Sequence, residues 1–164
     1  MVNTNRRTLQ KGEQAFYCYG HRSNKYLLVN YGFCFQDNGY DSFEFNLVPN
    51  PPLFKLGEIV FLSAPKKGRN LQQVRLKKDQ INEMLLFYIR CHLGRPRNEP
   101  WDLYELRVLN WYLDVIEFLI ASRKFTQEEN REALKQPGLS WGHRMAIVYR
   151  SEQMSILENQ RVVV

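Results

Sequence analysis

Apolar residues recur at helical spacing through the second half of the chain. Between Pro100 and Ala121, leucine and isoleucine return every three or four residues, which places them on one face of an α-helix. The stripe consists of Leu103, Leu106, Leu109, Leu113, Ile116 and Ile120. Because Pro100 also suits the first turn of a helix, this pattern predicts a long helix whose leucine stripe packs into a core.

A second helix is expected just before it. Asp79 is the expected N-cap of a helix that reaches about His92, and Gly94 is its stop. The residues expected to face inward are Ile81, Met84, Leu85 and Tyr88.

Two more capped helices are predicted after the long one. The run Thr126-Gln127-Glu128-Glu129 matches a capping box and starts a helix to about Gln136, which Pro137-Gly138 ends. Ser140 caps the last helix. Its expected inward-facing residues are Trp141, Met145, Val148 and Ile156.

The first third of the chain carries strand patterns instead. In residues 41–48, Phe43, Phe45 and Leu47 alternate with polar residues, which predicts a strand with one buried face. Residues 13–19 have apolar or aromatic side chains on both faces, which predicts a strand buried on both sides.

A short helix is predicted between these two strands. Ser23 is its expected N-cap, residues 24–30 its body and Gly32 its end. Its inward side chains are expected to be Leu27, Leu28 and Tyr31. After it we expect an extended segment over 33–35 and a turn over 36–39, because Asn-Gly is a strong turn signal.

The run Pro49-Asn50-Pro51-Pro52 is the predicted boundary within the chain, because prolines interrupt both ladders and helices. Beyond it, strands are expected over 54–62 and 74–77, with a basic loop over 66–70 between them. The sequence of 164 residues thus divides into a β-rich part over 1–48 and a mostly helical part over 53–159.

The net charge of +6 comes from 23 basic and 17 acidic residues, and the excess is clustered. The basic runs are Arg6-Arg7, Lys66-Lys67-Gly68-Arg69, Arg75 with Lys77-Lys78, and Arg95-Pro96-Arg97. Such a surface suits nucleic acid or an acidic protein, but the sequence favours a basic face that is merely solvated. No aromatic residues alternate with the basic ones as in a base-stacking platform, so nucleic acid ranks last among the expected partners.

Cysteine and histidine usage points to an intracellular protein without a metal. Three cysteines with no Cys-x-x-Cys spacing favour buried, reduced thiols over a disulfide framework. The histidines are scattered, so no metal site is predicted. No apolar run is long enough for a membrane span, and the start lacks the apolar segment of a signal peptide. We expect the protein in the cytoplasm or the nucleus.

Common catalytic motifs are missing. The chain has no Walker loop, Gly-x-Gly-x-x-Gly, Gly-x-Ser-x-Gly or His-Glu-x-x-His, which removes nucleotide hydrolysis, Rossmann redox chemistry and the common hydrolases and zinc proteases. What remains is a group of tyrosines: Tyr17, Tyr19, Tyr26 and Tyr31. Spacing alone favours an aromatic core over a functional site.

The order of residues around these tyrosines is more specific. Residues 12–33 read Gly-Glu-Gln, a strand, Tyr-Gly, a basic residue, Ser-Asn, Leu-Leu and Tyr-Gly-Phe. This order resembles the C-terminal end of a SET domain, in the subfamily of the RuBisCO large-subunit and actin-histidine methyltransferases. The predicted helices resemble the all-helical substrate-binding domain of that subfamily. The resemblance implies an α+β fold, with a SET remnant over 1–48 and a helical substrate-binding domain over 53–159.

The resemblance also implies roles for individual residues. Tyr19 matches the catalytic tyrosine whose hydroxyl lies beside the transferred methyl group. Tyr31, Gly32 and Phe33 match the segment that packs against S-adenosylmethionine and the target side-chain channel. The Ser23-Asn24 pair matches the start of the short helix and is interpreted as structural. Because a phenol is protonated at neutral pH, the expected duty of the tyrosine is alignment rather than proton abstraction.

One departure shapes the functional hypothesis. The cofactor site of the family also needs a glycine-containing loop and an Asn-His motif before residue 12, and the chain has no Asn-His dipeptide. We therefore expect the C-terminal part of an S-adenosylmethionine-dependent protein-lysine N-methyltransferase, supplying half of an active site and the region that binds the protein substrate. Family members modify lysine, and at least one subfamily modifies histidine. The alternative is a non-catalytic fragment that binds a protein partner.

Overall fold

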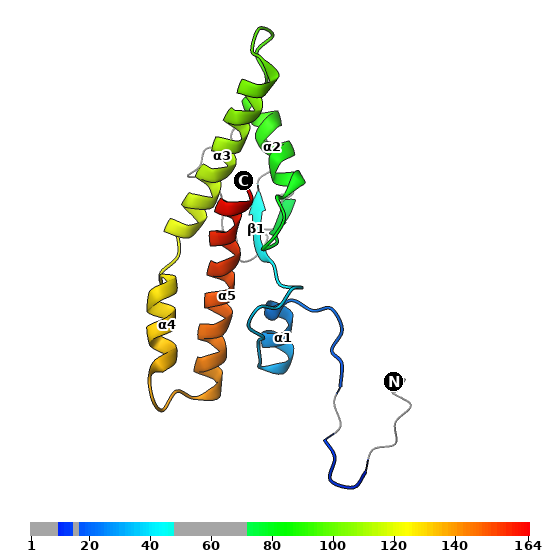
Figure 1. The fold of residues 1–164 in the computed structure, drawn as a ribbon, viewed down its shortest axis with the longest axis vertical. Coiled ribbons are helices and arrows are strands. Elements are labelled where there is room, and N and C mark those ends of the chain that lie inside the picture. The colour runs from blue at the N-terminus through cyan, green and yellow to red at the C-terminus, as the bar shows by residue number, and fades with distance from the viewer. Residues whose placement is uncertain (1–9, 15–16, 48–71) are drawn as a thin grey trace, which may run out of the picture.

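The computed structural model of the protein describes residues 10–14, 17–47 and 72–164. The helices and strands are α1 (Asn24–Tyr31), β1 (Phe43–Leu47), β2 (Gln72–Leu76), α2 (Glu83–Leu93), α3 (Trp101–Ala121), α4 (Gln127–Lys135) and α5 (Trp141–Val163). Figure 1 shows an elongated body, with α2 and the start of α3 at one end, α4 and the start of α5 at the other, and α1 beside α5. The described fold is helix-rich with a small sheet, which agrees with an α+β class; the SET remnant stays a prediction.

The described sheet consists of β1 and β2, which pair antiparallel in register from Phe43 opposite Leu76 to Leu47 opposite Gln72. We call this antiparallel strand pair the hairpin, whatever joins its two strands. The predicted alternation is confirmed, since the side chains of Phe43, Phe45 and Leu47 are buried. The proline run, the strand predicted over 54–62 and the loop predicted over 66–70 lie outside the described residues. The division into two domains stays a prediction, although β1 and β2 come from opposite sides of the expected boundary.

The main core lies between this hairpin and helices α2, α3 and α5. The face of α3 that it buries is only partly the predicted one. Leu103 and Leu106 are 54% and 55% exposed. The residues of α3 that are buried are Tyr104, Val108, Tyr112, Val115, Ile116 and Leu119. Of the predicted stripe, Ile116 is buried, and Leu109 and Ile120 are half-buried against the core. The buried face is therefore offset from the leucine stripe.

The start of α2 is also corrected. The N-cap is Asn82, whose side-chain oxygen accepts a hydrogen bond of 2.8 Å from the Leu85 amide, and not Asp79. Asp79 lies in the turn between β2 and α2, where an isolated bridge joins Lys77 and Gln80. Leu85 is buried as predicted, whereas Met84 is exposed.

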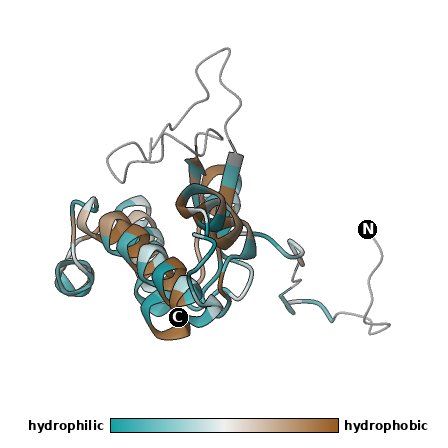
Figure 2. Ribbon diagram, turned by 90° about the horizontal axis from the view of Figure 1, so that it is seen from above, coloured by the Kyte–Doolittle hydropathy of each residue, from teal (hydrophilic) through white to brown (hydrophobic). Residues whose placement is uncertain are grey.

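Helices α4 and α5 begin at the predicted caps. Thr126 and Glu129 form a full capping box, and Ser140 accepts a hydrogen bond from the His143 amide. Figure 2 shows α4 almost entirely in the hydrophilic colour, so its start is held by these polar contacts more than by a buried face. In α5, Met145, Val148 and Ile156 are buried as expected, but Trp141 is 64% exposed.

Replacing Thr126 with alanine is expected to lower the free energy of unfolding by about 1 kcal/mol, because the Glu129 amide at the start of α4 loses the hydroxyl that caps it. Urea denaturation followed by circular dichroism measures this. Thr126→Ser is the matched control, because serine keeps the hydroxyl acceptor. Equal stability of the alanine and serine variants would contradict the role of the cap.

The segment before α1 departs most from expectation. Residues 17–20 form no strand, so the strand predicted over 13–19 is wrong for the described residues. Tyr17 and Cys18 are exposed instead of buried. A strand needs a neighbouring ladder for its amide and carbonyl groups, and no described strand pairs with this segment.

The cysteines are all unpaired thiols, but only Cys34 is buried; Cys18 and Cys91 lie at the surface, which corrects the expectation of burial. No helix in the described ranges combines the length and apolar character needed to cross a membrane.

Candidate functional site

Helix α1 and the loop after it form the framework of the candidate site. Ser23 caps the helix by accepting from the Tyr26 amide at 3.3 Å, and Gly32 ends it in the left-handed conformation with φ of 74°. Both were predicted from the sequence. Leu27 points into the core, but Tyr31 is 49% exposed, contrary to the inward position expected for it.

Asn24 ties the loop back onto α1. Its side chain is fully buried, donates to the Phe35 carbonyl at 2.8 Å and accepts from the Phe35 amide at 3.0 Å. Its oxygen also accepts from the Asn38 amide side chain at 3.1 Å. Asn24 therefore satisfies the backbone of an irregular segment that has no strand partner among the described residues, which agrees with the structural interpretation of the Ser-Asn pair.

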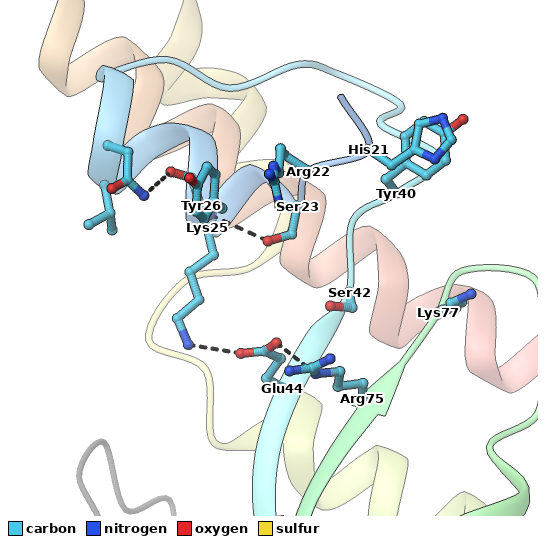
Figure 3. Close-up of a pocket in the computed structure, with 12 residues that line it drawn as sticks. His21, Arg22, Ser23, Lys25, Tyr26, Tyr40, Ser42, Glu44, Arg75 and Lys77 are labelled. Atoms are coloured by element: carbon cyan, nitrogen blue, oxygen red, sulfur yellow. Dashed lines mark hydrogen bonds and ion pairs between the residues drawn. The ribbon is translucent and has the colours of Figure 1, made fainter. Parts of the chain in front are cut away.

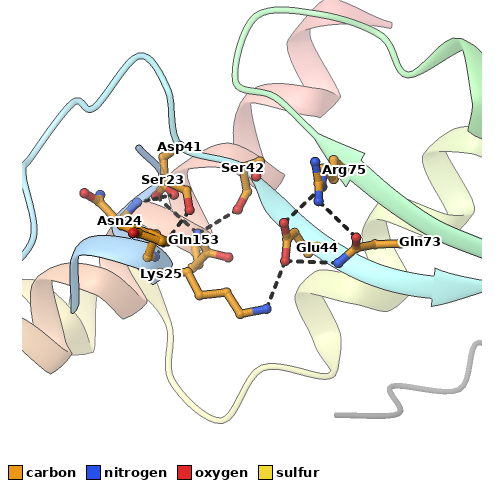
Figure 4. A network of polar contacts seen from close by, with 10 residues as sticks. Ser23, Asn24, Lys25, Asp41, Ser42, Glu44, Gln73, Arg75 and Gln153 are labelled. Atoms are coloured by element: carbon orange, nitrogen blue, oxygen red, sulfur yellow. Dashed lines mark hydrogen bonds and ion pairs between the residues drawn. The ribbon is translucent and has the colours of Figure 1, made fainter. Parts of the chain in front are cut away.

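Asp41 connects this framework to α5, as Figure 4 shows. Its carboxylate accepts from the Asn24 backbone amide at 2.9 Å and from the Gln153 side chain at 3.3 Å. Gln153 also donates to the Ser42 carbonyl at 3.2 Å. Burial raises the pKa of Asp41 above its ordinary value, against the opposing effect of these hydrogen bonds.

The start of α5 holds the segment after Gly32. The Trp141 indole nitrogen donates to the Gly32 carbonyl at 3.0 Å. One turn further on, the Met145 sulfur accepts from the Cys34 amide at 3.4 Å, and both side chains belong to a small buried cluster with Val148. Burial raises the pKa of the Cys34 thiol to about 11, so this cysteine is an inert packing residue.

This framework presents a group of exposed rings, which we call the aromatic cluster. Its members are Tyr17, Tyr19, Tyr26, Tyr31, Phe33 and Phe35. The centroid of the Tyr19 ring lies 4.6 Å from that of Tyr31 and 5.2 Å from that of Phe33. The Tyr26 and Tyr31 centroids are 6.1 Å apart. Desolvation, followed by the effect of neighbouring Tyr26, raises the pKa of Tyr31, so its hydroxyl is a hydrogen-bond donor at neutral pH.

The structure thus brings the predicted residues Tyr19, Tyr31, Gly32 and Phe33 into one place, although it does not test their roles. Tyr19 is 36% exposed, so its ring is only partly covered. Open aromatic faces attract cations, including cationic ligands, and phenol hydroxyls add directed hydrogen bonds. The described ranges contain no group of three or more side chains able to hold a metal ion.

A cleft of about 550 Å³ borders the aromatic cluster, between α1 and the hairpin (Figure 3). The cleft does not show in the sequence, because its basic residues come from separate stretches of the chain. Arg22 lies just before the cap of α1 and Lys25 in its first turn, whereas Arg75 belongs to β2 and Lys77 follows it. Only Tyr26 belongs both to the cleft lining and to the aromatic cluster.

Fold and site together define a helix-rich α+β protein with an exposed aromatic site between a short helix and its C-terminal helix. No protein-family model matches the sequence. The chain is similar to the actin-histidine N-methyltransferases of Rattus norvegicus and Danio rerio, at 25% and 24% identity over 91% and 92% of its length. The protein of that name from Homo sapiens is 25% identical over 90% of the chain. The chain spans 29% of the length of these curated relatives. This weak homology supports a relationship to methyltransferases as a class.

Proposed function

We propose that this chain is part of an S-adenosylmethionine-dependent protein N-methyltransferase, to which it contributes the tyrosine segment and a helical region that binds the protein substrate. The observation that carries the proposal is the similarity to actin-histidine N-methyltransferases, which extends over 90% of the chain or more. The aromatic cluster supports it, because the matching tyrosine and Tyr-Gly-Phe segment lie together in space.

The cluster fits one end of the cofactor. S-adenosylmethionine supplies an electrophilic methyl group on a positively charged sulfur. The Tyr19, Tyr31 and Phe33 rings are exposed or half-buried and pack against one another, so together they offer outer ring faces against which such a cation would lie. We therefore assign these three rings and the backbone at Gly32 to the sulfonium end, as the resemblance implies.

The contribution of the chain would be alignment and exclusion of water. Methyl transfer forms a nitrogen–carbon bond as the sulfur–carbon bond breaks, and it requires a neutral acceptor nitrogen, so the side chain to be modified must lose a proton first. The Tyr19 hydroxyl would orient the methyl group by a polar contact. Phe33 and Tyr31 would form the apolar walls that line up the acceptor.

The acceptor we favour is a histidine side chain. The relatives that support the proposal are named for the modification of histidine in actin. Lysine, the target expected from the sequence resemblance, becomes the second candidate. Both present a nitrogen that is nucleophilic only when deprotonated, so the alignment assigned to the tyrosine segment serves either.

The proposal is tested by cofactor binding and methyl transfer. The 164-residue chain, and the longest polypeptide its gene encodes, are titrated calorimetrically with S-adenosylmethionine and assayed with radiolabelled cofactor on histidine- and lysine-containing proteins. We expect binding and labelling by the longest polypeptide. No cofactor binding and no labelling by either would overturn the proposal in favour of a non-catalytic protein-binding fragment.

A further inference from the structure

The cleft between α1 and the hairpin has a one-sided charge. Four basic side chains line it (Arg22, Lys25, Arg75 and Lys77) against one carboxylate, that of Glu44. Four basic side chains against one carboxylate leave an excess of three positive charges among the described lysine, arginine and glutamate side chains of the lining. A concave surface of one sign raises the local concentration of ligands of the opposite sign.

The carboxylate of Glu44 already has partners within the protein. Glu44 accepts from Lys25 at 2.9 Å and lies 3.1 Å from the Arg75 guanidinium, and Gln73 donates to it at 3.2 Å. Figure 4 shows these partners converging on Glu44 from α1 and β2. Glu44 therefore holds two basic residues in place across the cleft, while the side chains of Lys25 and Arg75 remain 57% and 64% exposed.

The other two basic residues are available to a ligand. The Arg22 guanidinium lies 4.8 Å from the centroid of the Tyr26 ring, and it forms no ion pair with any described residue. Lys77 is exposed and likewise has no acidic partner within the described ranges. Figure 3 shows Arg22 beside Tyr26 and Lys77 on the opposite, hairpin side.

The rest of the lining is suited to a peptide. His21 stacks on Tyr40 with centroids 4.1 Å apart and planes 12° apart, and Val29 adds an apolar surface. The cleft also continues into the aromatic cluster, since Tyr26 lines the one and contacts Tyr31 of the other. A chain segment could therefore place one side chain at the cluster and its neighbours in the cleft.

We propose that this cleft binds an acidic segment of the protein substrate, next to the residue that is modified at the aromatic cluster. The proposal rests on the proposed function for the identity of the neighbouring site. Aspartate or glutamate side chains of the segment pair with Arg22 and Lys77, and the Lys25–Glu44–Arg75 arrangement keeps the charge on that side positive. The cleft thus selects substrates by charge, whereas the cluster acts on the target residue.

The test measures fluorescence anisotropy of two labelled peptides without cofactor. Both carry a central histidine, flanked by glutamates in one and by glutamines in the other. We expect the chain to prefer the acidic peptide, and Lys77→Glu to weaken its binding about tenfold. Glu44→Gln removes the one carboxylate among the described residues of the lining, and we expect it to strengthen binding of the acidic peptide. Lys124→Glu is the matched control, an exposed lysine outside the lining that lies beside Phe125, and we expect no change.

The outcomes separate this proposal from the proposed function. Equal affinity for both peptides, or the same response to Lys77→Glu and Lys124→Glu, would overturn the proposal that the cleft binds an acidic segment, even if methyl transfer occurs. A preference for acidic peptide that follows the charge variants supports it even if no transfer is found. A single-stranded oligonucleotide that binds more tightly than the acidic peptide and depends equally on Lys77 would show a nucleic-acid site and overturn the proposal.

Discussion

Replacing Asn24 with alanine is expected to lower the free energy of unfolding by about 2–4 kcal/mol. The substitution removes two hydrogen bonds to the Phe35 backbone and one from Asn38. The Phe35 amide and carbonyl would then be left without their partner in a partly buried setting, which costs more than the loss of an exposed hydrogen bond. Urea denaturation at neutral pH gives the difference.

The matched control is Asn30→Ala in the same helix. Asn30 also donates from its side chain, to the Tyr26 carbonyl at 2.8 Å, but it is exposed. We expect its replacement to change stability by no more than about 0.5 kcal/mol. Similar stabilities of the two alanine variants would show that the loop after α1 does not depend on Asn24.

Replacing Tyr19 with phenylalanine is expected to slow methyl transfer about 100-fold in the longest polypeptide of this gene, while cofactor affinity changes little. The substitution keeps the ring that lies 4.6 Å from Tyr31 and 5.2 Å from Phe33, and removes only the hydroxyl. A contact that aligns the methyl group in the transition state affects the rate rather than binding. Single-turnover transfer and calorimetric titration separate the two.

Tyr88→Phe is the control for this variant, because Tyr88 lies partly buried against the main core and away from the aromatic cluster. We expect it to leave the rate unchanged. An undiminished rate for Tyr19→Phe would remove the catalytic role assigned to its hydroxyl. Loss of cofactor binding together with rate would instead make Tyr19 a binding residue.

Local sequence signals correctly predicted the starts of α1, α4 and α5 and the position of β1. Ser23, Thr126 and Ser140 act as caps where expected, because a cap depends only on residues within one turn. The strand at 43–47 was found because its alternation comes from burial of one face. Asp79 was the exception, because α2 begins only at Glu83 and the Asn82 side chain caps it instead.

The face of α3 was partly mispredicted for a physical reason. Tyrosine was not counted as a core residue in the leucine stripe, yet Tyr104 and Tyr112 are buried. Their hydroxyls find partners: Tyr104 donates to the Arg90 carbonyl at 2.9 Å, and Tyr112 bonds to the Gln160 side chain. A buried phenol with a partner adds a large apolar surface at little polar cost, so these rings occupy the core and Leu103 and Leu106 are left outside.

The site was only partly accessible to sequence analysis. The rings of the aromatic cluster come from one stretch of 19 residues, from Tyr17 to Phe35. A short helix and a turn within that stretch are enough to bring them close together. The supports of that cluster could not be found in this way. The indole of Trp141 was expected in the core, and nothing in its neighbourhood indicates a bond to the Gly32 carbonyl. The basic cleft joins α1 to β2 and is equally invisible to local patterns.

The bonds between α5 and the loop after α1 set an order of assembly. Trp141 to Gly32, Met145 to Cys34 and Gln153 to Asp41 join residues 109, 111 and 112 positions apart. Such contacts close long stretches of chain and form late in folding. During synthesis, α5 leaves the ribosome after the other described helices and strands, so the aromatic cluster gains these anchors only once α5 has emerged. A nascent chain cut short within α5 would keep the tyrosines without the geometry that joins them.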